Sequence, residues 1–410
     1  MKKKAISLLM AAAMSATMLA GCGSDGGDKQ NAAAGADAAG ADEAGADAAG
    51  SDAADAAGAD AASTEEAPAD NAAAVSDMKI AMVTDSGDIT DESFNQITWE
   101  TCIAFGEDKG VEYEYYKPAE DTDEERINAI DLAITEGATV IVMPGYLFGP
   151  AIAEEQALYP DVSFIAVDVT EGDIVNLAGE AVSLGENVYI CSFQEEQAGY
   201  LAGYAAVKDG YTKLGFLGGI AVPAVIRYGY GYVQGINDAA EELGVDVSVK
   251  YYYGGQFYGD DAITARMEGW YADGTEVVFA CGGGIYTSAV DAAKEHDGKV
   301  IGVDVDQRPI IGESCVTSAM KGLHSAVYAA LDAYSTGNWA SIGGKSETLG
   351  LEGGDYLGLP TEGESWGFST FTVDEYNAVL AGIKDGSVTV SNDIENQPTV
   401  GAHVTVDYVE

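Results

Sequence analysis

The segment KIAMVTDSGDITDESFNQITWETCIAFGEDKG, residues 79–110, contains the unit whose repetition decides the fold. Residues 79–84 have the length and apolar character of a buried strand, and the polar stretch after them leads into a helix expected over 93–109. A buried strand followed by an amphipathic helix is the repeating unit of a parallel sheet that is covered by helices. This segment therefore predicts an α/β fold.

The same alternation continues along the chain. Further strands are expected at 111–116, 139–143, 163–167, 213–217, 246–253, 276–280 and 299–303. Further helices are expected at 123–136, 195–208, 225–243, 260–271 and 287–295. The units form two successive sets of about four, divided near 185–192, which predicts two Rossmann-like lobes with parallel sheets rather than one unusually wide sheet.

The N-terminus has the pattern of an export signal. Lysines occupy positions 2–4, residues 5–20 form an apolar run too short to span a bilayer, and small residues precede Cys22. This pattern resembles bacterial lipoprotein signals, which implies a signal peptide over 1–21 and a lipid anchor on Cys22. The alternative is an ordinary secretory signal in which Cys22 has no role.

Residues 22–77 are predicted to form a disordered acidic tether. They consist almost entirely of Ala, Gly, Asp, Glu and Ser, with Lys29 as the only basic residue and no large apolar residue before Val75. Such a segment has too little apolar surface to bury against the entropy of ordering. Its acidic side chains repel one another and favour an extended chain.

The formal net charge of −49 argues against nucleic acid or anionic surfaces as partners. The cysteines after Cys22 form no CxxC pair, and their spacing suggests neither a zinc site nor a disulfide framework. We therefore expect buried free thiols at Cys102, Cys191, Cys281 and Cys315, and no metal or cofactor.

Ligands of open parallel sheets bind at the carboxyl ends of the strands, and acids or glycines follow the predicted strands at several of these ends. The residues concerned are Asp85, Asp168, Gly218–Gly219, Gly282–Gly284 and Asp304. Acids without a basic cluster suit a neutral, donor-rich ligand better than a phosphate. Each acid alone could equally be a turn or helix-capping residue, and Phe94 could be a core residue.

Several short motifs occur in an order and spacing that resemble the basic membrane protein family, which is typified by the purine nucleoside receptor A. They are VTD (83–85), SFNQ (93–96), YPDV (159–162) before Asp168, EQAGYLAG (196–203), GFLGG (215–219), IGVD (301–304) with DQ (306–307), and TS (317–318) with Lys321. The resemblance covers 78 to about 334. It implies a lipoprotein that serves an ABC transporter, with a type I periplasmic-binding-protein fold whose hinged lobes close on a nucleoside.

Carried over to this chain, the family's ligand residues have distinct expected roles. Asp85 and Asn95 would bond the base edge, while Phe94 and Tyr228 would stack on its two faces. Asp304 would accept the ribose hydroxyl pair. The pocket would be completed by Asp168, Gly282, Gly283 and Lys321. Arg227 and Lys321 could instead be surface cations paired with acids.

The chain departs from the family pattern at a few positions of the pocket. Tyr228 stands where the family usually has Phe, within an aromatic run at 228–232 that offers other tyrosines for stacking. Val305 replaces a common Ser, and His324 stands near a position where an acid is frequent.

The resemblance also predicts the organisation and partners of the protein. One lobe would comprise 78–190 plus about 316–340, and the other 191–315 plus about 341–410. The expected protein is a monomer, anchored by lipid at the extracytoplasmic face of the membrane, that delivers its ligand to an ABC permease by a hinge-closing cycle.

Two other functions remain open at this stage. A protein of the same fold could bind a sugar or an autoinducer-type furanoside, or sense rather than transport. A nucleoside hydrolase is less favoured, because the only histidines are His296, His324 and His403 and none of them lies in a recognisable nucleophile motif such as GxSxG. Residues 282–288 also lack a P-loop lysine. Asp304 and Asp306, one residue apart on an extended segment, would point in opposite directions, which does not favour a metal site. We expect no catalytic residue.

Overall fold

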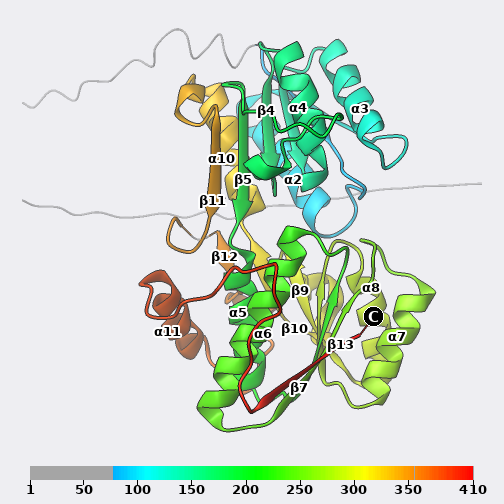
Figure 1. Cartoon of the computed structure of the whole chain (residues 1–410), viewed down its shortest axis with the longest axis vertical. Coiled ribbons are helices and arrows are strands. Elements are labelled where there is room, and N and C mark those ends of the chain that lie inside the picture. The colour runs from blue at the N-terminus through cyan, green and yellow to red at the C-terminus, as the bar shows by residue number, and fades with distance from the viewer. Residues whose placement is uncertain (1–76, 355, 410) are drawn as a thin grey trace, which may run out of the picture. The chain divides into compact units, whose positions relative to one another are not determined.

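The computed structural model describes residues 77–354 and 356–409, which form two β-sheets with flanking helices (Figure 1). The predicted signal peptide, the lipid-anchoring Cys22 and all of the tether except Asp77 lie outside the described residues. Within the described ranges, no helix is both long enough and apolar enough to cross a bilayer.

The first sheet has six parallel strands in the order β11-β5-β4-β3-β1-β2. These are β1 (Lys79–Val83), β2 (Glu112–Tyr116), β3 (Val140–Pro144), β4 (Ser163–Val167), β5 (Val188–Phe193) and β11 (Lys345–Leu349). The helices of this part are α2 (Phe94–Lys109), α3 (Asp123–Thr135), α4 (Gly149–Leu158) and α10 (Leu323–Ser335). In β1, Ile80 and Met82 pack on the α2 side, and Ala81 and Val83 pack on the side of α3 and α4. This alternation explains why β1 is apolar throughout.

The second sheet has seven strands in the order β12-β10-β9-β8-β6-β7-β13, parallel except for the β10–β12 pair. These are β6 (Lys213–Gly218), β7 (Val247–Tyr253), β8 (Val277–Cys281), β9 (Lys299–Asp304), β10 (Cys315–Lys321), β12 (Leu357–Gly358) and β13 (Val404–Tyr408). The helices α5 (Glu195–Lys208) and α6 (Pro223–Leu243) share a core with Phe216 and Phe279, and α7 (Asp261–Ala272) and α8 (Tyr286–His296) share another with Val278. Two further helices follow, α9 (Arg308–Ile311) and α11 (Val373–Lys384).

The α/β class and the parallel sheets predicted from the sequence are confirmed. Each expected strand is present and begins and ends within one residue of its predicted bounds, and each expected helix within two. The thiols of Cys102, Cys191, Cys281 and Cys315 are free and buried, as predicted.

Strand pairing divides the chain differently from the predicted lobes. The expected boundary at 190/191 passes through β5, whose residues 188–193 are all buried in the six-stranded sheet. Residues 315–321, which the prediction placed almost wholly in the first lobe, form β10 beside β9 in the seven-stranded sheet. Residues 345–349, expected in the second lobe, form β11 beside β5. The chain therefore passes between the sheets after β5, after β10 and after β11.

The helices α5 and α6 pack at the distance that backbone contact allows. Glycines four residues apart face the partner helix on both sides: Gly199 and Gly203 on α5, and Gly231 and Gly235 on α6. A Cβ atom on Gly231 would lie 1.9 Å from the Glu196 carbonyl oxygen, and one on Gly199 would lie 2.1 Å from the Tyr228 carbonyl oxygen. We call these four residues the glycine seam. The seam fixes the first turn of α5 against the part of α6 that carries Tyr228.

Candidate ligand-binding site

A cavity of about 690 Å³ lies at the carboxyl ends of strands from both sheets. Its lining includes residues that follow β1 and β4 of the six-stranded sheet and residues that end or follow β6, β8, β9 and β10 of the seven-stranded sheet. The structure brings together, in this one lining, every ligand residue expected from the sequence: Asp85, Phe94, Asn95, Asp168, Tyr228, Gly282, Gly283, Asp304 and Lys321.

Asp85, which follows β1, is held by one donor of its own loop and one of α2. Its Oδ1 accepts hydrogen bonds from the Gly87 backbone N–H (2.7 Å) and from Asn95 Nδ2 (2.9 Å). Asn95 is 3% exposed, and its Nδ2 also donates to Asp91 Oδ2 at 3.1 Å. Asn95 thus donates its amide hydrogens to two carboxylates and orients Asp85. Burial raises the pKa of Asp85 to about 6, against the opposing effect of these hydrogen bonds.

The two expected stacking rings approach the same end of the cavity. Phe94 is the first residue of α2 and is partly buried, while Tyr228 lies in α6 and is almost completely buried. Their ring centroids lie 5.3 and 5.5 Å from the Lys321 ammonium. The Tyr228 hydroxyl lies 3.3 Å from the Ala319 carbonyl oxygen, which holds its ring against β10.

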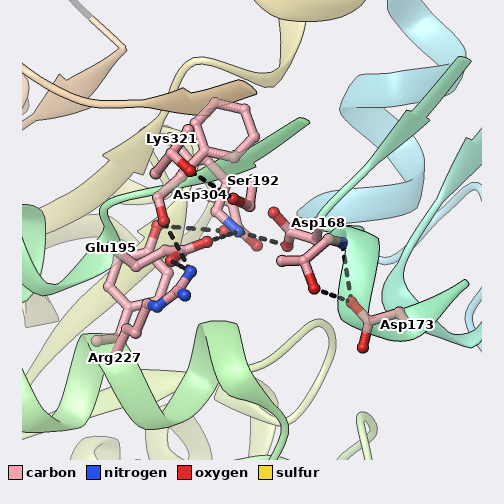
Figure 2. A network of polar contacts seen from close by, with 11 residues as sticks. Asp168, Asp173, Ser192, Glu195, Arg227, Asp304 and Lys321 are labelled. Carbon is pink, nitrogen blue, oxygen red and sulfur yellow. Dashed lines mark hydrogen bonds and ion pairs between the residues drawn. The ribbon is translucent and has the colours of Figure 1, made fainter. Parts of the chain in front are cut away.

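Lys321, the last residue of β10, is the centre of a buried charge cluster (Figure 2). Its side chain is 2% exposed, and its Nζ lies 2.6 Å from Asp168 Oδ2 and 3.1 Å from Glu195 Oε1. The interpretation of Lys321 as a surface cation is therefore wrong. Burial acts to lower the pKa of Lys321, but the carboxylates of Asp168, Glu195 and Asp304 raise it above its usual value, so the ammonium stays charged.

Arg227 extends the cluster away from Lys321. Its Nη1 lies 3.6 Å from Glu195 Oε2 and donates a hydrogen bond of 3.1 Å to the Phe193 carbonyl oxygen. Figure 2 shows Glu195 between the two cations. Because Phe193 ends β5, this contact lies where the chain leaves the six-stranded sheet.

Asp168 and Asp304 hold similar places at the ends of β4 and β9. Both have left-handed backbone conformations, with φ of 60° and 64°, which aspartate tolerates better than most residues. Asp304 Oδ2 accepts a hydrogen bond of 2.5 Å from Ser93 Oγ, which precedes α2. Burial raises the pKa of Asp304, while Lys321 and this hydrogen bond oppose the rise. Asp168 Oδ1 is buried, and no described residue gives it a hydrogen bond.

The glycines after β8 allow this loop to lie close to the loop that follows β6. Gly282 and Gly283 have φ of 139° and 50°, and a Cβ atom on Gly282 would lie 3.1 Å from the Gly219 backbone nitrogen. The backbone of Gly282 and Gly283 therefore lines the cavity directly.

His324, which departs from the family pattern, lies beside Thr101, with 3.0 Å between Nδ1 and Oγ1.

Sequence reasoning missed several residues at this site. Glu195 was expected only as the beginning of a helix, where acids are common, and nothing in the chain order links it to Lys321. Ser93 lies in the quoted SFNQ motif but was given no role. Phe257 lines the cavity from the segment after β7, and Gly254 and Gly255, which directly follow that strand, are the signal that could have pointed to it.

The chain is similar to known proteins over most of its described length. Residues 78–370 match the family model described as ABC transporter substrate-binding protein PnrA-like. The ABC transporter nucleoside-binding protein BmpA of Lactococcus lactis is 30% identical over 57% of this chain, and the match spans 65% of that protein's length. Basic membrane protein B of Borreliella burgdorferi is 28% identical, with 70% of this chain and 82% of that protein covered.

The fold is shared with solved structures. An ABC transporter solute-binding protein from Aeropyrum pernix superposes with a TM-score of 0.62 at 20% identity, covering 78% of this chain and 88% of that chain. This likeness confirms the predicted type I periplasmic-binding-protein fold. Because the family model matches well over half of the chain, this protein belongs to the Bmp family of PnrA-like ABC transporter substrate-binding proteins.

Proposed function

We propose that this protein captures nucleosides, with purine nucleosides preferred, and presents them to an ABC permease at the extracytoplasmic face of the membrane. The observation that carries the proposal is that Asp85, Phe94, Tyr228 and Asp304 line one cavity. Two aromatic rings suit a planar base, and carboxylates suit the N–H and O–H donors of a nucleoside. The Lactococcus lactis relative is itself described as nucleoside-binding.

Each wall of the cavity has a proposed role in this function. Asp85 accepts a base N–H, because its Oδ1 is already held by Gly87 and Asn95 and the second oxygen is left for the ligand. Asp304 accepts a hydrogen bond from a ribose hydroxyl, in addition to the one that it accepts from Ser93. Asp168 Oδ1 accepts a further ligand donor, since it is buried without a described partner. Lys321 donates from its ammonium.

Capture follows from the chain crossings between the two sheets. Movement at the segments after β5, β10 and β11 would open the cavity, and a ligand that contacts both walls would favour the closed form. In this proposal the closed monomer docks on the permease, and the lipid on Cys22 keeps it at the membrane.

The test is calorimetric titration of the purified protein, unfolded and refolded beforehand to remove carried ligand. Guanosine, inosine, adenosine, cytidine, uridine and ribose are compared. We expect nucleosides to bind, Asp304→Ala to abolish binding and Phe94→Ala to weaken it. A response to ribose alone would favour the sugar-binding alternative, and conversion of inosine to hypoxanthine during incubation would indicate a hydrolase.

A further inference from the structure

Glu195 is a buried carboxylate that lines the cavity, and none of the proposed ligand contacts involves it. Its side chain is 1% exposed, and both oxygens lack a hydrogen-bond partner among the described residues. Its interactions are ionic, with Lys321 at 3.1 Å and Arg227 at 3.6 Å. Burying a carboxylate in this way costs stability unless it is compensated, so its position calls for a reason.

The position of Glu195 is one that an anionic ligand would otherwise favour. It is the first residue of α5, a helix of 14 residues, and helix N-termini attract anions such as phosphate. Here the side chain of Glu195 supplies the anion. It also faces the cavity, whose lining it shares with Asp168, Asp304 and Lys321.

The cations of the cavity wall are all committed to carboxylates. Among the described residues that line the cavity, they are Lys117, Arg227 and Lys321. Lys117 pairs with Asp88 at 2.5 Å, Arg227 pairs with Glu195, and Lys321 pairs with both Asp168 and Glu195. A phosphate would therefore meet carboxylates and no uncommitted cation in this lining.

Size does not exclude a phosphorylated ligand. A cavity of about 690 Å³ lies within the range of roughly 300–1,000 Å³ that holds drug-sized molecules. Discrimination between a nucleoside and its phosphate must then come from charge. Lys321 is the cation best placed to receive a phosphate, because it lies within 5.5 Å of both expected stacking rings.

We propose that Glu195 determines the charge specificity of the site: as a built-in anion it shares Lys321 with Asp168, so that neutral nucleosides bind and nucleoside phosphates are rejected. Glu195 acts through Lys321 rather than through a required contact with the ligand. The proposal rests on the proposed nucleoside function and assigns one selectivity of that function to a residue.

The test compares guanosine with guanosine 5′-monophosphate by calorimetry in the full chain. The matched control is Glu196, the next residue of α5, which is also buried but is not among the ion-pair partners of Lys321, which are Asp168 and Glu195. Burial raises the pKa of Glu196 to about 7, and burial likewise raises the pKa of Glu195 against the opposing effect of its two cations. Measurement at pH 8 therefore keeps Glu196 mostly ionised and favours the charged form of Glu195.

We expect the wild type to prefer guanosine over the monophosphate by at least about 100-fold, because the phosphate would lie against carboxylates of the same charge. Glu195→Gln should reduce the ratio of guanosine affinity to monophosphate affinity by at least about tenfold, because one of the carboxylates that repel the phosphate is gone. Glu195→Asp and Glu196→Gln should preserve the ratio. Glu195→Met, of similar volume and without charge, provides a second neutral variant if the amide disturbs folding.

An unchanged ratio in the neutral Glu195 variants would overturn the proposal, as would an equal narrowing in Glu196→Gln, which would indicate a diffuse charge effect. A wild type that binds neither compound would instead refute the nucleoside function itself, which distinguishes the two failures.

Discussion

Replacing Lys321 by methionine should destabilise the protein strongly. The change removes the cation from a cluster in which its side chain is 2% exposed and its Nζ lies 2.6 Å from Asp168 and 3.1 Å from Glu195. Methionine fills a similar volume, so the main effect is to leave buried carboxylates without their counter-ion. Removing one partner of a buried ion pair costs about 3–5 kcal/mol, and we expect a loss of this size in the free energy of unfolding at pH 8.

The loss should shrink as the pH falls. Burial already raises the pKa of Glu195 and of Asp304 in the folded protein, and removal of Lys321 raises both further. The folded variant then binds protons more tightly than the unfolded chain, so its stability falls as the pH rises above the unfolded pKa values. Relative to wild type, Lys321→Met should therefore recover stability between pH 8 and pH 5.5.

Urea denaturation at several pH values measures this effect. The matched control is Lys208→Met, because Lys208 pairs with the half-exposed Glu242 at 2.9 Å, and such surface pairs contribute about 0–1 kcal/mol. The double variant Glu195→Gln with Lys321→Met should be more stable than Lys321→Met alone. A loss below about 1 kcal/mol that is independent of pH would refute the view of a charged, ion-paired Lys321.

Three further outcomes are expected. Ser93→Ala removes a charge-assisted hydrogen bond to Asp304, worth about 1.5–3 kcal/mol. Because this bond joins the loop after β1 to the end of β9, the ligand-free protein should open, seen as a larger radius of gyration in solution scattering; an unchanged radius would contradict this. With the pKa of Asp85 at about 6, inosine affinity should fall between pH 7.5 and pH 5 as the accepting carboxylate is protonated. Calorimetry of Asp85→Asn should show a smaller fall, since the raised pKa of Asp304 is the other contribution; an equal fall would contradict the role of Asp85. Gly231→Ala should lose about 1–3 kcal/mol or more in urea denaturation, because the new Cβ would lie 1.9 Å from the Glu196 carbonyl oxygen, whereas Gly269→Ala, with no atom within 4 Å of the new Cβ, should gain up to about 1 kcal/mol.

The sequence predicts the central strands well because their environment is uniform. Strands such as β3 and β4 are covered by helices on both faces, so every residue is buried and the run is apolar. Edge strands lack this signal. β11, with the sequence KSETL, is half exposed and reads as a loop, and its place beside β5 depends on a pairing across more than 150 residues of chain.

The crossing points could not be read from the sequence for a related reason. β5 and β10 are each followed by a helix, as are strands that remain in one sheet, although the helices after β5 and β10 begin within two residues and those after β1, β2, β6, β7 and β8 begin five or more residues after the strand ends. The difference lies in which sheet the next helix packs against, and α10 packs on α2 rather than beside β10. Only long-range packing decides this.

The candidate site was predictable where chemistry accompanies position in the chain. Asp85, Asp168 and Asp304 directly follow or end strands, and the strand-end rule gathers them without any knowledge of the packing. Glu195 escaped because its carboxylate is informative only beside Lys321, 126 positions later in the sequence. The engagement of both Asn95 amide hydrogens is likewise visible only in three dimensions.

The glycine seam has a consequence for how this protein could change its ligand. Because α5 and α6 touch through their backbones, Glu195 and Tyr228 belong to one inflexible wall, and a bulkier residue at the seam would displace both together. Small backbone shifts of α5 or α6 therefore cannot adapt this side of the cavity to a different ligand. New preferences, whether evolved or engineered, should arise on the opposite wall and at the rim, where Ser86, Asp88 and Tyr258 line the same cavity from loops.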